Sequence, residues 1–315
     1  IIGWLFGIPV PFILMFAPNW SWIIGANVFL GINQGLAWSS TVVMKIDLVG
    51  EKRRGFAMGL NEFAGYLSIA IVAIITGWIA DNYGIRPYPF YLGFALVFFG
   101  LVLSIFFVKD TRHHVAQEST TTSIPQLKNP FKQVTWKHKN LGSITQAGLV
   151  NNLNDGMIWG ILPILLLSLN YDSKNIGIIA AIYPTVWGIG QLFTGKMSDH
   201  YSKKRMIFWG MLLQGIAIIL IPYFTSFYEL ASIAAILGLG TALVYPTFLS
   251  AIASATSPTQ RAESIGVFRL WRDLGYAIGA ILSGIIADIY GIETAIITIG
   301  VITILSSIVI QLRMP

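Results

Sequence analysis

Long apolar runs separated by short polar loops dominate this sequence and restrict where the chain can fold. Only 11% of the 315 residues are charged and 55% are hydrophobic, whereas soluble domains carry about 25% charged residues. A helical run of about 20 apolar residues is long enough to cross the hydrocarbon core of a bilayer. The composition therefore predicts a membrane protein and argues against a soluble enzyme, a nucleic-acid-binding module and a disordered chain.

Ten such runs are present, and each predicts one transmembrane helix. A membrane barrel would instead show shorter segments of alternating polarity. The predicted fold class is thus all-α, a polytopic membrane protein. The ten runs cover residues 1–18, 20–45, 54–81, 87–108, 141–169, 175–195, 205–224, 229–253, 261–288 and 290–312.

The region 109–140 is the one long polar connection between these runs. We interpret it as a linker between an N-terminal bundle of four helices, residues 1–108, and a C-terminal bundle of six helices, residues 141–315. Clusters of Lys and Arg in short loops mark the cytoplasmic side of a membrane protein. Placing the loop between Lys45 and Arg54 inside also puts the linker and most other cations inside, which accounts for the net charge of +6 without nucleic acid.

A repeat appears when the chain is compared with itself at an offset of 207 residues. The match runs without gaps over residues 54–85 and 261–292, and duplication of this kind is common in transporters. Identical pairs include Arg54/Arg261, Gly59/Gly266, Gly77/Gly284, Asp81/Asp288, Tyr83/Tyr290 and Gly84/Gly291. Equivalent helices then run in the same direction, so two pseudo-symmetric bundles are expected.

The offset has a consequence for length. Residues 141–207 hold two predicted helices whose counterparts in the first repeat would precede Ile1. We therefore expect ten of twelve transmembrane helices here, with the first two and roughly 66 residues missing from the front of the first bundle.

Two short motifs carry a resemblance to a known family. The segment 195–205 resembles the cytoplasmic G-x-L-A-D-R-x-G-R-[RK] loop of the major facilitator superfamily, with His200 in place of an Arg and Ser202 in place of a Gly. Residues 34–37 resemble the R-x-x-Q-G-x-G-A-A motif of many proton-coupled members, with Gly31 at the Arg position. The resemblance covers the whole chain and implies secondary transport by two rocking bundles.

The loop motif has a physical interpretation. A carboxylate at Asp199 can pair with the positive end of a helix dipole, and the resemblance implies that this helix is the one after Arg54. Such a contact would latch the cytoplasmic side in the outward-open state. A local salt bridge with Lys203 or Arg205 is the alternative. The latch candidates are Gly195, Asp199, Lys203, Lys204 and Arg205.

Ionisable side chains inside apolar runs are costly and need a reason. The candidates for proton coupling or charge pairing are Glu62, Asp155, Arg269, Arg272 and Asp273. Arg269 and Asp273 are spaced i, i+4 and can form a permanent structural pair. Arg272 then has no obvious mate on its helix, which favours Glu62 or an anionic substrate as its partner.

Polar and aromatic side chains in three of the helices are expected to line a substrate cavity. Asp155 belongs to a stripe with Asn151 and Trp159, on a helix that lines the cavity in the family that the chain resembles. A buried carboxylate there could carry a proton, although an Asp that only caps a break at Gly156 is an alternative. The cavity candidates are Asn33, Gln34, Trp38, Asn151, Asn154, Trp159 and Tyr245.

Catalytic and metal-binding patterns are missing from the sequence. There is no cysteine, no H-E-x-x-H and no P-loop, and the four histidines lie in polar regions. We therefore expect no enzyme activity, no metal and no cofactor.

The predicted function is secondary active transport of a small organic solute by alternating access, with proton-coupled export as the leading hypothesis. Proton-coupled uptake of a small organic anion is the alternative, motivated by Arg269 and Arg272. A transport-dead receptor or scaffold with the same fold is a rival from another class. The expected partners are a small-molecule substrate, protons and the lipid bilayer, with no nucleic acid, for a monomer in the plasma (inner) membrane whose linker and basic loops face the cytoplasm.

Overall fold

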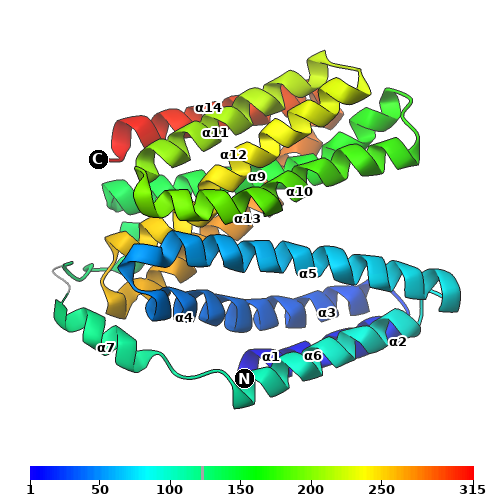
Figure 1. Ribbon diagram of the computed structural model, residues 1–315. Helices are drawn as coiled ribbons and strands as arrows, with labels where there is room; N and C mark the ends of the chain where they lie inside the picture. Colours follow the sequence, from blue (N-terminus) through cyan, green and yellow to red (C-terminus); the bar gives the residue numbers. More distant parts are fainter. Residues whose placement is uncertain (122–123) are drawn as a thin grey trace. The chain divides into compact units, whose positions relative to one another are not determined.

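The computed structural model describes residues 1–121 and 124–315, with side chains throughout except those of Glu51, Thr121 and Ser173. Residues 122 and 123 of the predicted linker lie outside the described residues. Every regular element within the described ranges is a helix, as predicted (Figure 1). The chain divides into two compact units, residues 1–48 with 64–117, and residues 49–63 with 118–315. The predicted boundaries after residues 108 and 140 stay a prediction.

The first unit contains short helices near the N-terminus and longer ones after residue 64. Its helix α5 begins in the second unit and continues into the first. The elements up to the linker are α1 (Ile2–Gly7), α2 (Pro9–Phe16), α3 (Trp20–Asn33), the π-helix η1 (Gln34–Trp38), α4 (Ser39–Val49), the 3₁₀ turn η2 (Glu51–Arg53), α5 (Arg54–Tyr83), α6 (Tyr88–Phe106) and α7 (Arg112–Thr121). Of these, η2, the start of α5 and the end of α7 belong to the second unit.

In the second unit the long helices α9 to α14 form one bundle in which neighbours in space are mostly not neighbours in sequence: α9 packs against α13 and α14, α10 against α12, and α11 against α12 and α14 (Figure 1). Short helical turns precede or connect them. The elements are α8 (Pro130–Lys132), η3 (Gln133–Lys137), α9 (Lys139–Ser168), α10 (Ser173–His200), α11 (Lys203–Leu220), η4 (Ile221–Tyr223), α12 (Phe227–Ala255), η5 (Pro258–Gln260), α13 (Arg261–Tyr290) and α14 (Ile292–Arg313).

The sequence repeat has a structural counterpart in α5 and α13. Each helix has 30 residues, and both ends of α13 lie 207 residues after the matching ends of α5. The glycine that follows each helix, Gly84 and Gly291, has a φ of +97° and +92°. This region of backbone space is costly for residues with a Cβ, so the same residue ends both repeat-equivalent helices for the same reason.

Side-chain caps determine where several helices begin. The Asp172 carboxylate accepts from Asn175 N (2.9 Å) at the start of α10. At α12, Ser226 and Glu229 form a capping box. These contacts satisfy backbone N–H groups that have no partner within the helix. Short polar loops can therefore separate long apolar helices without leaving the helix ends unpaired.

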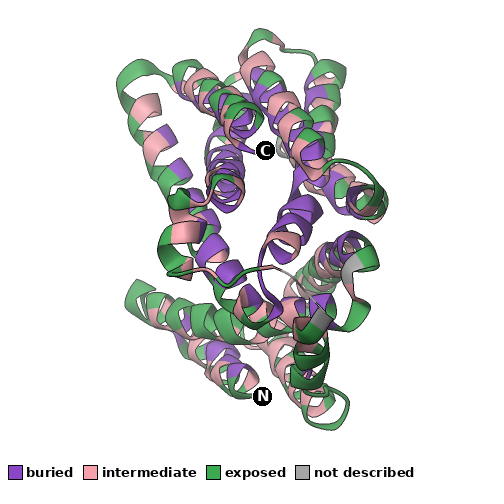
Figure 2. Cartoon of the chain, turned by 90° about the vertical axis from the view of Figure 1, so that its left-hand side faces the viewer, coloured by how far each residue is buried: buried purple, intermediate pink, exposed green. Residues whose placement is uncertain are grey.

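Small residues allow close helix packing inside the second unit. An added Cβ on Gly279 of α13 would lie 2.7 Å from Leu153 Cα of α9, and Gly275 contacts the Leu149 backbone in the same way. Gly156 of α9 in turn meets the Tyr276 backbone of α13. Close backbone approach at small residues is typical of helix pairs in membranes. Figure 2 shows the buried residues on the inner sides of the bundle that contains the C-terminus.

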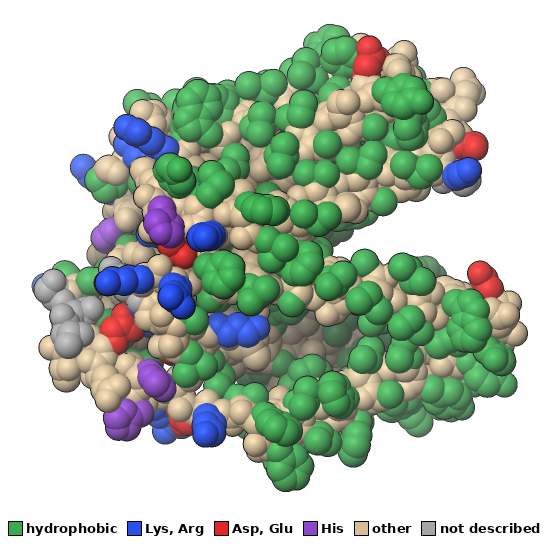
Figure 3. Space-filling model, viewed as in Figure 1, with side chains coloured by type: hydrophobic (Ala, Val, Ile, Leu, Met, Phe, Trp, Pro, Cys, Tyr) green, Lys and Arg blue, Asp and Glu red, His purple; other side chains and the backbone are tan. Residues whose placement is uncertain are grey.

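Seven of the described helices are long and apolar enough to cross a membrane by length and composition. Hydrophobic side chains cover the sides of the helices on the visible face, and within the second unit Lys, Arg and His side chains gather where α5 begins and α10 ends (Figure 3). The seven spans are Arg54–Tyr83, Tyr88–Phe106, Lys174–His200, Lys203–Tyr223, Phe227–Ala255, Pro258–Tyr290 and Ile292–Arg313.

The other three predicted runs form helices that differ from a simple apolar span. Residues 1–18 form two short helices, α1 and α2, and residues 20–45 are divided between α3 and α4 by the π-helix η1. The run 141–169 forms the 30-residue α9 up to residue 168, and Asn151, Asn152, Asn154 and Asp155 follow in close succession there. Short or interrupted helices in the first two runs and buried polar side chains in the third thus explain why these runs differ from a long apolar helix.

Candidate functional site

The Asp199 carboxylate caps the N-terminus of α5. It accepts hydrogen bonds from the backbone N–H groups of Gly55 (2.6 Å) and Phe56 (2.9 Å). These are orphan donors at the positive end of the helix dipole. Both oxygens of Asp199 are therefore engaged by the start of α5, the helix that the latch hypothesis names.

Glycines bring the two backbones together beside Asp199. A Cβ added to Gly195 would lie 2.6 Å from the Gly55 carbonyl oxygen and 2.8 Å from the Gly59 Cα. Gly195 thus acts through its lack of a side chain. Gly55 and Gly59 were not among the predicted site residues, although their four-residue spacing is a sequence signal for close helix packing.

The three predicted basic residues form the first turn of the next helix. Lys203, Lys204 and Arg205 begin α11, and Ser202 caps that helix by accepting from Arg205 N (3.4 Å). They lie directly after the loop that follows Asp199. Their contribution to a latch stays a prediction.

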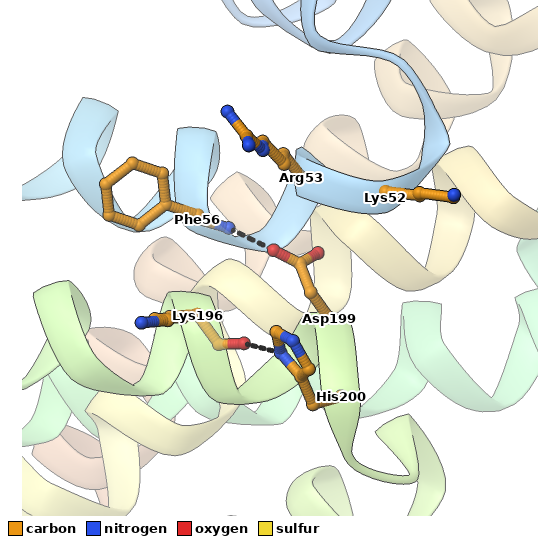
Figure 4. A pocket seen from close by; sticks show the side chains of 6 residues that line it. All are labelled: Lys52, Arg53, Phe56, Lys196, Asp199 and His200. Carbon is orange, nitrogen blue, oxygen red and sulfur yellow. Dashed lines mark hydrogen bonds between the residues drawn. The ribbon is translucent and has the colours of Figure 1, made fainter.

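A cavity of about 470 Å³ opens next to the Asp199 contact. Figure 4 shows Asp199 reaching the Phe56 backbone, while His200 Nδ1 lies 3.0 Å from the Lys196 carbonyl oxygen. Basic side chains dominate its wall. The lining residues are Lys52, Arg53, Phe56, Lys196, Asp199 and His200.

Asp155 is buried in the middle of α9 and bonds to a tyrosine of α10. Tyr183 Oη donates to Asp155 Oδ1 and lies 3.2 Å from Thr241 Oγ1 of α12. Helix α9 continues without interruption from Lys139 to Ser168. The alternative that Asp155 caps a break at Gly156 is therefore wrong, because Gly156 makes room for the α13 backbone instead.

The other predicted α9 side chains point into different surroundings. Asn151 is 1% exposed and donates to Asn152 Oδ1 (3.4 Å), whereas Trp159 exposes 44% of its surface. Asn154 donates to Gln214 Oε1 (3.1 Å) and accepts from Thr303 Oγ1 (2.6 Å). Asn154 thus joins α9 to α11 and α14 inside the bundle.

Sequence reasoning missed the partners of these α9 side chains. Gln214 is the only amide in the predicted run 205–224, and Tyr183 is a hydroxyl-bearing side chain in the apolar run 175–195. A buried polar side chain in an apolar run needs a hydrogen-bonding partner. That signal was available, but it does not say which helix supplies the partner.

Arg272 is paired differently from the prediction. Its guanidinium donates to Asp273 Oδ1 from Nε (2.8 Å) and Nη2 (2.6 Å), while Arg269 lies 3.9 Å from Asp273 Oδ2. The inference that Arg272 lacks a mate on its own helix is thus wrong, because the adjacent carboxylate can fold back onto it. Arg272 also lies over the Tyr245 ring, 5.2 Å from its centroid.

Glu62 belongs to the same electrostatic environment. It is 2% exposed, accepts from Asn61 Nδ2 (2.8 Å) and interacts electrostatically with Arg269 and Arg272. The negative charge of Glu62 therefore acts on both Arg269 and Arg272 within the second unit.

Tyr245, the aromatic cavity candidate of α12, packs edge-on against Trp187, with ring centroids 5.1 Å apart.

The cavity candidates of the first unit cluster around the π-helix η1. Gln34 and Trp38 are its first and last residues, and Asn33 donates to the Gly3 carbonyl oxygen (2.8 Å). Single π-helical turns occur frequently at functional sites, where they change the direction of side chains. Gly65 allows the Trp38 ring to approach α5 closely.

Comparison with known proteins places this arrangement in a family. A family model described as Major Facilitator Superfamily matches residues 1–143 and again residues 144–315. The chain belongs to the major facilitator superfamily. This membership confirms the resemblance predicted from segments 195–205 and 34–37, and it makes the chain a multi-pass membrane protein of a family of transporters. That family consists of transporters, which is consistent with the prediction that the chain is not an enzyme.

Three relatives from bacteria and archaea are similar to parts of this chain. An uncharacterized MFS-type transporter of Methanocaldococcus jannaschii is 27% identical over 56% of this chain, and that match spans 46% of the relative's own length. A multidrug resistance efflux pump PmrA homolog of Lactococcus lactis is 21% identical over 94% of this chain and 72% of its own. The multidrug resistance protein MdtG of Proteus mirabilis is 22% identical over 88% and 68%.

A solved superfamily structure shares the fold. The human organic anion transporter MFSD10 superimposes with a TM-score of 0.77 at 15% sequence identity, covering 98% of this chain and 76% of the human protein. At that identity the likeness concerns the fold alone.

Proposed function

We propose that this protein is a secondary active transporter that exports a small organic solute in exchange for protons. Alternating access requires a site whose access changes sides, and the superfamily moves small molecules in this way. The observation that carries the proposal is the set of buried charges within the helices of the second unit. Asp155 is 5% exposed, Glu62 2% and Arg272 8%. Burial of this kind is expensive in a membrane and is a default indication of function.

The geometry supports distinct roles for these groups. Asp155 accepts a hydrogen bond from Tyr183, which can donate to the carboxylate and release it when the proton arrives. Glu62 interacts with two arginines, so a change in its charge would alter that network. Asp199 at the N-terminus of α5 would close the cytoplasmic side when its contact is made, with the basic residues Lys203, Lys204 and Arg205 near it.

The proposal includes the topology. Ten segments of this chain, arranged in two bundles joined by the linker 109–140, span the membrane of a monomer in the plasma (inner) membrane. The linker and the basic loops face the cytoplasm because most Lys and Arg residues lie there. The proposed cavity residues are Asn33, Gln34, Trp38, Asn151, Asn154, Trp159 and Tyr245.

Export is favoured by the relatives. The proteins of Lactococcus lactis and Proteus mirabilis are described as a multidrug efflux pump homolog and a multidrug resistance protein. Uptake of an organic anion is the second candidate, and the buried Arg269 and Arg272 favour it, since a guanidinium recognises carboxylates.

The test uses inverted membrane vesicles containing the protein, with an imposed pH gradient, acidic inside. The probes are ethidium as an organic cation and fluorescein as an organic anion. We expect ethidium to accumulate inside. Asp155→Asn and Glu62→Gln should each slow that flux by about a hundredfold, the order of effect for a group that transfers protons.

The matched control is Glu293→Gln, an exposed acid in the first turn of α14. It should keep the flux. Unchanged flux in both Asp155→Asn and Glu62→Gln would overturn the proton assignment. If fluorescein accumulated in right-side-out vesicles but not in inverted ones, uptake of an organic anion would be favoured. If neither probe were transported, the transport-dead scaffold would be favoured.

A further inference from the structure

Two repeat-equivalent arginines occupy an unusual position at the start of α5 and α13. Arg54 and Arg261 are the first residues of these helices and are 2% and 1% exposed. A buried cation requires a hydrogen-bonded anion, and a positive charge at a helix N-terminus is opposed by the helix dipole. Both arginines therefore need a negative partner.

One linker carboxylate serves both of them. Glu118 Oε1 of α7 accepts from Arg261 Nη2 at 2.7 Å and from Arg54 Nη2. Arg54 Nη1 also reaches the Ala253 carbonyl oxygen near the end of α12 (3.4 Å). Burial raises the pKa of Glu118, but the hydrogen bonds and charges of the two arginines outweigh burial and hold it below its ordinary value. Glu118 therefore stays negatively charged at neutral pH.

The linker has a second attachment at the same end of α13. The Leu127 N–H donates to Gln260 Oε1 (2.7 Å), and Gln260 Nε2 donates back to the Leu127 carbonyl oxygen (3.0 Å). Gln260 directly precedes Arg261. The linker thus contacts the N-terminal end of α13 at two places, through Leu127 and through Glu118.

We propose that the linker is a closing element: Glu118 ties the N-terminal ends of α5 and α13 together, and its bridge to Arg54 or Arg261 must break before those ends separate. The two helices are the matched halves of the repeat, so one carboxylate controls both halves at once. The inference rests on the alternating access proposed above, but it concerns the linker and not the proton-carrying acids or the Asp199 contact.

The chain contains no cysteine, so a single introduced thiol can report the separation. Ser264 lies one turn after Arg261 on the same face of α13 and is 0% exposed. In a Ser264→Cys background, the rate of labelling by a water-soluble maleimide measures how often this end of α13 opens. No substrate or proton gradient is needed.

Glu118→Gln should raise the labelling rate about tenfold, the effect expected when a charge-assisted hydrogen bond is lost. Asp110→Asn is the matched control, because Asp110 is an exposed linker acid that pairs with Arg112. It should leave the rate unchanged. Arg54→Gln should raise the labelling rate less in the Glu118→Gln background than in the chain with Glu118 intact. The reason is that both substitutions remove the same interaction.

A triple variant, with Glu118→Gln, Arg54→Gln and Arg261→Gln, removes the bridge without leaving a buried charge unpaired. It keeps the test decisive if Glu118→Gln alone does not fold. Fast labelling of the triple variant supports the closing element. Labelling of Glu118→Gln or of the triple variant as slow as that of Asp110→Asn overturns it. Fast labelling together with unchanged flux in Asp155→Asn and Glu62→Gln would retain the closing element and reject proton coupling.

Discussion

At the scale of single residues, the charge of Glu118 determines how the linker bridge responds to pH. The pKa of Glu118 lies below its ordinary value of 4.5, because two arginines outweigh the effect of burial. A depressed carboxyl pKa stabilises the bridge at every pH above the ordinary value, and that contribution is lost only as the pH falls through the lowered pKa. The bridge is therefore a poor proton sensor in the range where cells operate.

We predict that labelling of Ser264→Cys, corrected for the reagent's own pH dependence, stays constant from about pH 8 to about pH 5.5 and rises only below the ordinary carboxyl pKa. Glu118→Gln should show the high rate throughout. A labelling rate that changed severalfold between about pH 8 and about pH 5.5 when Glu118 is present, but not in Glu118→Gln, would contradict the assignment of a negative charge to Glu118.

At the scale of helices, the close contact of α10 with the start of α5 depends on two backbones touching. Gly195→Ala would place a methyl group 2.6 Å from the Gly55 carbonyl oxygen. We expect a loss of about 1–3 kcal/mol in the free energy of unfolding, as for other overpacked sites. The measurement is thermal unfolding in detergent, followed by scanning fluorimetry.

Gly177→Ala is the control on the same helix. Nothing lies within 4 Å of a Cβ at Gly177, so helix propensity alone should act and raise stability by up to about 1 kcal/mol. Equal effects of the two substitutions would show that the contact between α10 and α5 contributes nothing.

At the scale of the whole molecule, the distribution of cations predicts which loops face the cytoplasm. In the cysteine-free chain, a thiol at Asp110 in the linker should react with a membrane-impermeant maleimide only in inverted vesicles. A thiol at Asp172, in the loop before α10, should react in intact cells. Reaction of both from the same side would reject the alternation of spans, since the two positions are separated by one span in the proposed topology.

Sequence patterns anticipated the large-scale organisation well. Apolar runs, the 207-residue repeat and the loop 195–205 were enough to predict the helical fold and the family, and the family resemblance in turn implied the Asp199 contact with the helix after Arg54. These features rest on periodicity and on local motifs, which a single sequence displays. The matching 30-residue helices α5 and α13 follow directly from the repeat.

Side-chain partners were harder to predict, because they depend on which faces of distant helices meet. Tyr183 was not foreseen for Asp155, nor Gln214 and Thr303 for Asn154. Arg272 was expected to seek a mate elsewhere, yet it bonds to the adjacent Asp273, an arrangement that helical spacing rules overlook. The role of Glu118 was not predicted either, because it lies in a polar segment without periodicity.

The turn at Gly291 has a consequence for how the chain enters a bilayer during synthesis. A single residue separates α13, which ends at Tyr290, from α14, which begins at Ile292. Two long apolar helices joined so tightly expose almost no polar loop that must be carried across the lipid. They can insert together as a hairpin, and only a residue able to adopt a φ of +92° permits so abrupt a reversal. A residue with a Cβ at position 291 would therefore strain this turn and hinder the paired insertion of α13 and α14.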